Sequence, residues 1–564
     1  MAVFQEIGSS ACLLTAAKVA DVIACAPGND GEQADAPQAF TQTELKGVET
    51  WIELPREQWP ASWFIDPGGG RPLQPKYRRP VCRLRLALYG HPHSGVFWEK
   101  HCNKSLARQD FLPIPGWEQC FYHRKLKLFL VVYVDDFKLV GPKQNIKEGW
   151  RLISKEINLD EPTPLQKYLG CDHNKRTMPI EQARKHYERF TEIVAQISKN
   201  SPTDKAIMAA DQRRGETPAG HSQNTVNTMS YSMDGFAMQC VERYLELSGE
   251  DLSQLKPAPT PTLDDHQFPA QHESKGALSL VCAKIVMKVL FMARFYRYDL
   301  LYAVNHIARF LTKWTTACDR KLRRLIAYIY HTKDMILSSI IGDRFADCHL
   351  AVFSDADFAG DLLESKSTSG CFVAIIGPRT FAPVSALCKT QSCVSHSSTE
   401  SEIIALDFAL RTEGLPLLLL LQSICNEGQG HERVENDLRR ALANKEEGNH
   451  QRKTTGPQMV VFEDNEAVIK IVLKRRSMAL RHVLRTHRIA MDWCFEVCAQ
   501  PDVHLKYINT RLQVADLMTK GFGKMQVWGD LVALSGLHMP ITNSPQPLVY
   551  SSVCLLALPR SEEH

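Results

Sequence analysis

The chain has 564 residues, 44% of them hydrophobic and 23% charged, and a formal net charge of +4. This length suits three or four domains of ~100–200 residues each, and the composition has no class-defining excess. The small net charge leaves any nucleic-acid binding to local basic clusters. The 17 cysteines form no CxxC pair, which argues against a disulfide framework or a zinc knuckle and favours a reducing compartment.

Targeting and membrane-spanning patterns are absent from the sequence. The first 28 residues lack a basic stretch followed by a compact apolar core, so we expect no secretory signal. The apolar runs at 415–425 and 548–559 are shorter than the ~20 residues that span a bilayer. We therefore expect a soluble intracellular protein with no membrane partner.

The pattern of residues changes several times along the chain. Residues 1–200 mix helical and strand patterns, whereas residues 201–275 are polar and irregular, which predicts a linker or insertion. In residues 276–345 apolar residues recur at three- and four-residue spacing, which predicts helices. Residues 346–530 are rich in predicted strands, and residues 531–564 carry no readable pattern. This order predicts a multidomain protein of α+β and α/β class.

Two adjacent carboxylates, Asp135 and Asp136, interrupt an apolar stretch in the first part of the chain. The apolar run 128–134 precedes them, and apolar sequence resumes at Phe137. This pattern predicts a hairpin with the pair at its turn. Aspartate is common in solvated turns, but a pair of carboxylates also suits Mg²⁺, which takes one or two of them together with substrate phosphates.

A second set of acidic residues follows predicted strands and helices in the strand-rich part: Asp355, Glu402, Asp464 and Asp516. An Asx-rich turn explains the SDAD sequence around Asp355 equally well. Thr399 and Glu402 fit the capping-box pattern of a helix start, so Glu402 has a purely structural alternative. A second polar insertion, at about 427–457, separates a leucine-rich helix from the strand that precedes Asp464.

Several motifs occur together and in a recognisable order. They are GEQADAPQAFTQTEL, RLRLALYGHPHSGVFWEKH, YVDD and TPLQKYLGCDH in the first part, and FSDADFAGDLLESKSTSGCFV, ALCKTQSCVSHSSTESEIIAL, DNEAVI and INTRLQVADLMTK in the second. This series resembles the Pol polyproteins of Ty1/copia-type retrotransposons, with a reverse transcriptase followed by a ribonuclease H. The resemblance covers roughly residues 1–530. His93 stands where the family has glutamine, and the 34 residues before Asp35 are fewer than in the family, so we expect the fingers region to be truncated.

The resemblance assigns metal-binding and catalytic roles to seven carboxylates, with Glu400 as the alternative to Glu402. They are Asp35, Asp135 and Asp136 for polymerisation and Asp355, Glu402, Asp464 and Asp516 for hydrolysis. Each set would hold two Mg²⁺ or Mn²⁺ ions. Phe40 matches the aromatic residue that abuts the incoming sugar, and a core aromatic residue is its alternative role.

The segment RRSMALRHVLRTHRIAMDWCFEV is basic and matches a segment of the family beside the ribonuclease H site. The resemblance assigns nucleic-acid contacts there to Arg481, His482, Arg485 and Arg488. A solvated helix face would have the same composition.

The resemblance implies a fold, an activity and partners. The fold is a reverse-transcriptase palm with a mixed sheet in residues 1–200, a helical connection in 276–345 and a ribonuclease H-like α/β domain in 346–530. The activity is RNA-directed DNA synthesis with hydrolysis of RNA in RNA–DNA hybrids. The partners are an RNA template, a DNA primer and deoxynucleoside triphosphates, met in cytoplasmic virus-like particles and in the nucleus. Two alternatives stay open: an inactive remnant, which includes a module that only binds hybrid duplex, and a derivative that is only a nuclease.

Overall fold

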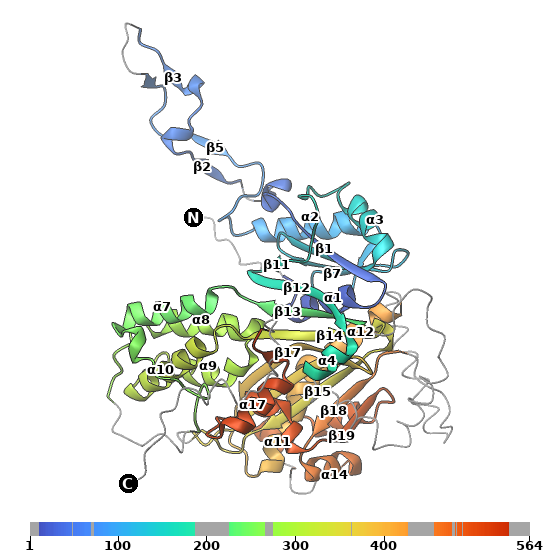
Figure 1. Ribbon diagram of the computed structural model, residues 1–564. Coiled ribbons are helices and arrows are strands. Elements are labelled where there is room, and N and C mark those ends of the chain that lie inside the picture. The colour runs from blue at the N-terminus through green and yellow to red at the C-terminus, as the bar shows by residue number, and fades with distance from the viewer. Residues whose placement is uncertain are drawn as a thin grey trace.

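The computed structural model describes residues 11–47, 49–68, 73–186, 225–264, 274–361, 364–426, 456–475, 480, 482–487 and 489–540. Residues 201–224 and 265–273 of the predicted linker, most of the second insertion and the tail beyond 540 lie outside these ranges. The described strands form two large sheets and two small hairpin sheets (Figure 1). Within the same ranges, no helix has the length and apolar character needed to cross a membrane.

The first large sheet has six strands in the order β10-β1-β9-β8-β7-β6. Their bounds are β1 Asn29–Asp35, β6 Phe111–Pro113, β7 Cys120–His123, β8 Leu128–Tyr133, β9 Asp136–Pro142 and β10 Thr163–Pro164. Every pairing is antiparallel, which corrects the mixed sheet that we expected here. The reason is local: β6 to β9 follow one another through short turns, and such a meander pairs neighbouring strands in opposite directions.

Strand β8 is buried on both faces, which explains its uninterrupted apolar sequence. Leu128 and Leu130 point into a core that includes Trp98 of α2 (Ser94–Arg108) and Trp150 of α3 (Lys143–Ile153). Phe129 belongs to the other core, on the side of α1 (Leu14–Cys25). A strand that alternates its side chains between two apolar layers needs apolar residues at every position.

Helix α1 lies between the two large sheets (Figure 1), contacting β1 and β9 of the first and β13 and β17 of the second. Ten of its twelve residues are buried. Two of these, Lys18 and Asp21, are charged. The helix is therefore the layer through which the two halves of the molecule pack.

The second large sheet has ten strands, nine of them in the order β11-β12-β13-β14-β17-β16-β15-β18-β19, with β20 paired to β14. Their bounds are β11 Lys167–Tyr168, β12 Cys171–Pro179, β13 Thr225–Ser232, β14 Ile336–Ile341, β15 His349–Ala356, β16 Thr368–Gly377, β17 Thr380–Thr390, β18 Met459–Glu463, β19 Val503–Tyr507 and β20 Leu537–His538. The pairs β15–β18 and β18–β19 are parallel. The sheet thus continues from the first part of the chain into the strand-rich part.

Two segments that we expected to be irregular contain folded elements. Strand β13 and helix α7 (Phe236–Ser248) lie within residues 201–275, because β13 pairs with both β12 and β14 and buries Val226 and Met229. Helix α17 (Met525–Leu534) and β20 extend the fold past residue 531. The rest of both segments lies largely outside the described residues.

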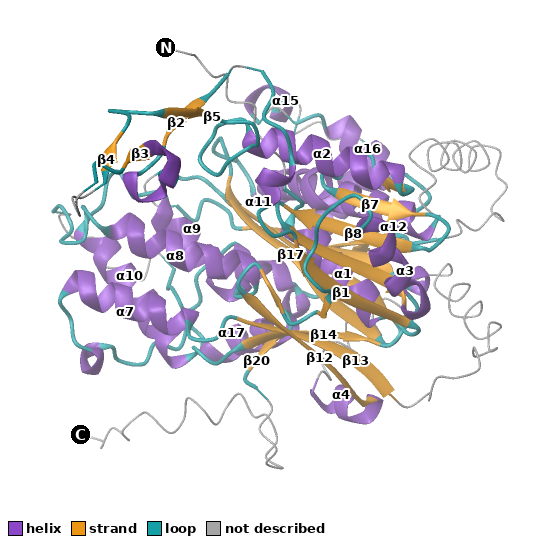
Figure 2. Ribbon diagram, turned by 90° about the horizontal axis from the view of Figure 1, so that it is seen from above, coloured by secondary structure: helices purple, strands orange, loops and turns teal. Residues whose placement is uncertain are grey.

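Helices α7 to α10 gather on one side of the strands (Figure 2), and residues 276–345 form helices followed by β14, as far as the structure describes them. These helices are α8 Cys282–Phe295, α9 Leu301–Ala308 and α10 Thr316–His331. The remaining α-helices of the described residues are α4 Ile180–His186, α11 Ser398–Ala409, α12 Leu415–Cys425, α14 Glu466–Lys474, α15 Val483–Thr486 and α16 Met491–Cys498. Of these, α11 packs across β15 and β16.

An arm projects from the body of the molecule (Figure 1). It consists of two small antiparallel pairs, β2 (Trp51–Glu53) with β5 (Val81–Arg83) and β3 (Phe64–Ile65) with β4 (Gln74–Pro75). Its base adjoins the end of β1, where Asp35 lies.

Candidate active sites

The carboxylates of Asp355, Glu402 and Asp464 meet at one edge of the second sheet. One candidate ligand atom from each lies within 4.8 Å of the others, and the described residues contain no other group of three His, Cys, Asp or Glu side chains as compact. Asp355 lies near the end of β15 and Asp464 directly after β18. Because β15 and β18 are adjacent and parallel, their carboxyl ends meet at the same edge.

Glu402 joins this cluster from α11, and a different residue caps that helix. Ser397 is the N-cap, and its Oγ accepts a hydrogen bond of 3.1 Å from the Glu400 amide. Glu400 Oε2 accepts one of 2.9 Å from the His396 amide. The alternative role of Glu402, in a Thr399–Glu402 capping box, is therefore wrong, because the helix begins earlier. Glu402 lies in the second turn, where its Oε2 accepts a hydrogen bond of 2.8 Å from the Ala356 amide.

Asp516 lies beside the cluster and is connected to it through a lysine. It belongs to a short 3₁₀ helix, Val514–Met518. Lys520 Nζ lies 2.7 Å from Asp516 Oδ1 and 3.7 Å from Asp355 Oδ2. Thr519 Oγ1 donates a hydrogen bond to Asp355 Oδ2. The structure thus brings all four predicted carboxylates of this half together, with one cation among them.

Burial and mutual repulsion make this cluster electrostatically unfavourable without a counter-ion. Burial, followed by Asp355, raises the pKa of Glu402 far above its usual range. The same two causes raise the pKa of Asp464 and of Asp516. Glu463, whose side chain is fully buried, adds a further carboxyl with a raised pKa, and sequence reasoning missed it because it ends an apolar strand. Convergent carboxylate oxygens are the donors that Mg²⁺ and Mn²⁺ prefer, so the residues present fit a divalent ion.

The second acidic group lies at the β8–β9 turn of the first sheet. Asp35, the last residue of β1, pairs with Asp136, the first residue of β9. Asp135 follows Val134 in the turn, and the Ala36 amide donates to its carbonyl oxygen at 2.9 Å. Val134 has φ of +60°, a strained conformation for a β-branched residue. The pair therefore lies at a hairpin turn, as its sequence predicts, with Asp35 on the neighbouring strand.

These three carboxylates are less buried and less compact than those of the second sheet. Asp35 is exposed, and Asp135 and Asp136 are half-buried. Burial and then Asp135 raise the pKa of Asp35, and burial, Asp135 and Asp35 raise that of Asp136 to about 6. Their oxygens do not form a three-ligand group within 4.8 Å. Carboxylates that suit a divalent ion thus lie at the ends of adjacent strands. Their oxygens are further apart than those of three ligands that share one ion.

Phe40 lies next to this group and forms a pair with Tyr89. Its ring centroid is 4.5 Å from that of Tyr89, and its side chain also packs against the core beneath the sheet. Burial, followed by the charges of Asp135 and Asp35, raises the pKa of Tyr89. Sequence reasoning did not single out Tyr89, although it belongs to the quoted motif RLRLALYGHPHSG.

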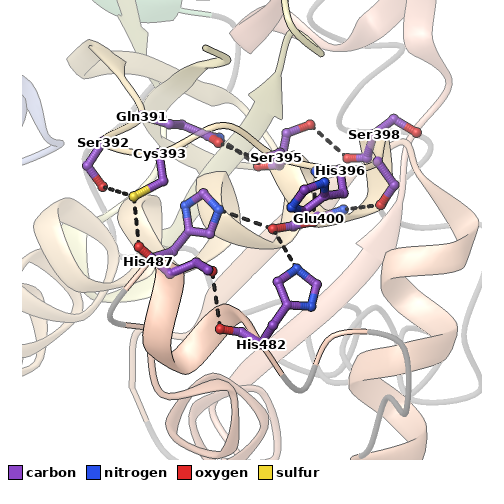
Figure 3. Close-up of polar contacts among 12 residues, drawn as sticks. Gln391, Ser392, Cys393, Ser395, His396, Ser398, Glu400, His482 and His487 are labelled. Carbon is purple, nitrogen blue, oxygen red and sulfur yellow. Dashed lines mark hydrogen bonds and ion pairs between the residues drawn. The ribbon is translucent and has the colours of Figure 1, made fainter. Parts of the chain in front are cut away.

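Two of the four residues that we expect to contact nucleic acid lie among the described residues. Arg485 is exposed on the short helix α15, and His482 precedes that helix with its Nε2 3.2 Å from Glu400 Oε1. Arg481 and Arg488 lie outside the described residues. Glu400 thus turns toward histidines (Figure 3). Glu402 rather than Glu400 joins Asp355 and Asp464.

The described residues thus form a mixed α/β architecture with two groups of carboxylates near strand ends. No protein-family model matches the sequence. The chain is 23% identical over 529 residues to "Retrovirus-related Pol polyprotein from transposon TNT 1-94" of Nicotiana tabacum, covering 92% of this chain and 32% of that one. It is 25% identical over 373 residues to the corresponding polyprotein from transposon RE2 of Arabidopsis thaliana, covering 66% of this chain and 20% of that one.

A shorter relative is matched over most of its own length. The chain is 23% identical over 343 residues to a "Putative transposon Ty5-1 protein" of Saccharomyces cerevisiae, covering 60% of this chain and 90% of that one. The chain spans about a third or less of the two plant polyproteins. It is a relative of the Ty1/copia-type retrotransposon Pol polyproteins, which confirms the resemblance predicted from its motifs.

Proposed function

We propose that the chain is an RNA-directed DNA polymerase and ribonuclease H of a Ty1/copia-type retrotransposon. The observation that carries the proposal is the cluster of Asp355, Glu402 and Asp464, whose ligand atoms lie within 4.8 Å of one another. Relationship to Pol polyproteins supports a nucleic-acid substrate. We also propose the corresponding division into a palm, a helical connection and a ribonuclease H-like domain.

The nuclease part of the proposal assigns the cluster to cleavage of RNA in an RNA–DNA hybrid. The strand order β17-β16-β15-β18-β19, with a parallel pair carrying Asp355 and Asp464, supports this assignment. Two divalent ions held by such carboxylates would activate water and stabilise the leaving oxygen. Asp516 and Lys520 would keep the charge of the site balanced while Glu402 and Asp355 hold their oxygens toward one another.

The polymerase part assigns Asp35, Asp135 and Asp136 to binding Mg²⁺ with the primer end and a deoxynucleoside triphosphate. The register Asp35↔Asp136 across β1 and β9 supports it, because it brings three carboxylates to one end of the sheet. Phe40, beside Asp35 and against Tyr89, would contact the sugar of the nucleotide. Substrate phosphates supply ligands that the protein lacks in such sites, so the looser carboxylate group remains compatible with this role.

A nuclease without polymerase activity is the second candidate. The observation that favours it is the contrast between the two acidic groups, since only the set in the second sheet forms a compact three-ligand group among the described residues. Both candidates predict cleavage of the RNA strand, but only the first predicts extension of the DNA primer.

One assay separates these candidates. The chain is incubated with Mg²⁺, deoxynucleoside triphosphates and an RNA template annealed to a DNA primer, with different labels on the two strands. Variants Asp135→Asn/Asp136→Asn and Asp355→Asn run alongside Asp334→Asn, which changes an exposed carboxylate paired with Lys333. Extension lost only in the double variant supports the polymerase. Cleavage without extension, lost in Asp355→Asn, supports the nuclease alone. Neither product would leave an inactive remnant.

A further inference from the structure

A buried carboxylate outside the proposed metal cluster connects the nuclease helix to a distant segment. Glu400 Oε1 lies 3.2 Å from His482 Nε2 and 3.1 Å from His487 Nε2 (Figure 3). The side chains of Glu400 and His487 are each 1% exposed, and that of His482 is 38% exposed. Both ring nitrogens of His487 are buried without a hydrogen bond of good geometry, and Glu400 Oε1 is the carboxylate oxygen that Nε2 faces.

The geometry makes Glu400 an anchor rather than a metal ligand. Its Oε2 already accepts the hydrogen bond from His396, and its Oε1 faces both imidazoles. Glu400 and the two histidines do not form a three-ligand group within 4.8 Å. A buried carboxylate needs a cation or hydrogen-bond donors close by, and here these come from residues 82 and 87 positions further along the chain.

The anchored segment, residues 480–487, is held at two further points. Leu480 and Val483 are buried in the core, and Cys393 Sγ donates a hydrogen bond of 2.7 Å to the carbonyl oxygen of Thr486. Arg485 in contrast is exposed on the same segment. The contacts therefore fix the described backbone at 482–487 while the Arg485 guanidinium lies in solvent.

The anchor and the proposed nuclease site share one helix. Glu400 and Glu402 both belong to α11, and Glu402 belongs to the carboxylate cluster. A helix that holds the cluster on one side and the segment 480–487 on the other sets the distance between them. We propose that Glu400, acting through His482 and His487, is a positioning residue that places Arg485 to contact a phosphate of the RNA–DNA hybrid. This inference rests on the proposed nuclease function.

The test compares Glu400→Ala, Arg485→Gln and the double variant in hybrid cleavage with Mg²⁺. Each single variant raises KM about tenfold, the scale of one charge-assisted hydrogen bond, and leaves kcat and the Mg²⁺ concentration for half-maximal activity unchanged. The double variant is no worse than the worse single one, because both changes remove the same contact. In each variant, the slope of the logarithm of hybrid affinity against the logarithm of salt concentration becomes shallower by about one unit, which corresponds to the loss of one phosphate contact.

A merely structural role for Glu400 gives a different result. Loss of kcat, a changed Mg²⁺ requirement, or effects of Glu400→Ala and Arg485→Gln that add would overturn the proposal. Glu400→Gln, which keeps an acceptor oxygen, should recover part of the affinity. If Glu400→Ala does not fold, His487→Gln and His482→Gln, compared by circular dichroism with the wild type, take its place.

Failure of the proposed function is distinguishable from failure of the positioning role. Binding of a fluorescent hybrid, measured by anisotropy with Ca²⁺ in place of Mg²⁺, does not depend on cleavage. If the wild-type chain binds the hybrid but does not cleave it, the proposed nuclease function is wrong. The role of Glu400 is then still tested by the Kd of the Glu400→Ala variant. A chain that cleaves, with Glu400→Ala unchanged in both KM and Kd, overturns the positioning role alone. A chain that does neither overturns both.

Discussion

Lys138 Nζ lies 2.7 Å from Asp21 Oδ1, and the two side chains are 0% and 1% exposed. This ion pair joins strand β9, two residues after Asp136, to helix α1 between the sheets. His173 Nε2 lies 3.2 Å from the other carboxylate oxygen. Burial alone would raise the pKa of Asp21, but Lys138 and His173 together lower it to about 2. A buried charge network therefore links helix α1 to strand β9, which begins with Asp136.

Asp21→Ala should destabilise the protein strongly. It leaves the Lys138 ammonium buried without its counter-ion, which typically costs about 3–5 kcal/mol. The free energy of unfolding, measured by urea denaturation, is expected to fall by that amount. The double variant Asp21→Asn/Lys138→Met removes both charges and should lose much less. Equal losses in the two variants would mean that packing, and not the uncompensated charge, governs this position.

Lys520→Met should make the protein depend on divalent ions for its stability. Asp355 and Asp516 raise the pKa of Lys520 against the lowering effect of burial, so its charge is the internal counter-ion of the cluster. Without it, we expect Tm in EDTA to fall below that of the wild type and Mg²⁺ to restore most of the difference. Lys470→Met, which breaks only an exposed pair with Glu466, is the matched control. A Tm that Mg²⁺ does not restore would contradict this role of Lys520.

Metal-free stability should decrease as pH rises. Burial raises the pKa of Asp357 to about 7, and the pKa of Glu402 is raised further. Such groups bind more protons in the folded state than in the unfolded state, so from about pH 4 to 7 the free energy of unfolding falls with increasing pH. Each such group contributes a loss of about 1.4 kcal/mol per pH unit over this range in EDTA. Glu402→Gln should flatten the dependence, and Mg²⁺ should oppose it above pH 7. An unchanged slope in Glu402→Gln would exclude the cluster as its source.

Local patterns in the sequence predicted the elements that surround both acidic groups. The apolar runs before Asp135 and Asp464 are strands because their residues are buried on both faces of a sheet, and such runs are readable without long-range information. The carboxylates at their ends were selected through the motifs around them, because an aspartate in such a turn is common by itself. The helical spacing in residues 276–345 was equally readable, since α8 and α10 each bury one continuous side.

Features that depend on distant partners could not be predicted. Strand β17 was missed because Pro383 interrupts its sequence, and only pairing with β16 and β14 defines it. Strand β13 has a polar sequence and owes its conformation to β12 and β14. The contacts of Asp21 with Lys138 and of Glu400 with His487 join residues 117 and 87 positions apart. No pattern within a short window contains that information.

The pair Phe40–Tyr89 leads to a prediction about sugar selection. If the first site is a polymerase, the Phe40 ring, 4.5 Å from the Tyr89 ring, occupies the space that a 2′-hydroxyl would need. Phe40→Ala should then raise ribonucleotide incorporation relative to deoxyribonucleotide incorporation by about ten- to a hundredfold, the discrimination that a small steric contact supplies. The measurement is the ratio of kcat/KM for the two triphosphates in primer extension. Tyr89→Phe keeps both rings and should leave this ratio unchanged. Because Phe40 also packs on the core, Tm of Phe40→Ala is measured alongside. A lowered Tm with an unchanged ratio would assign Phe40 to the core alone.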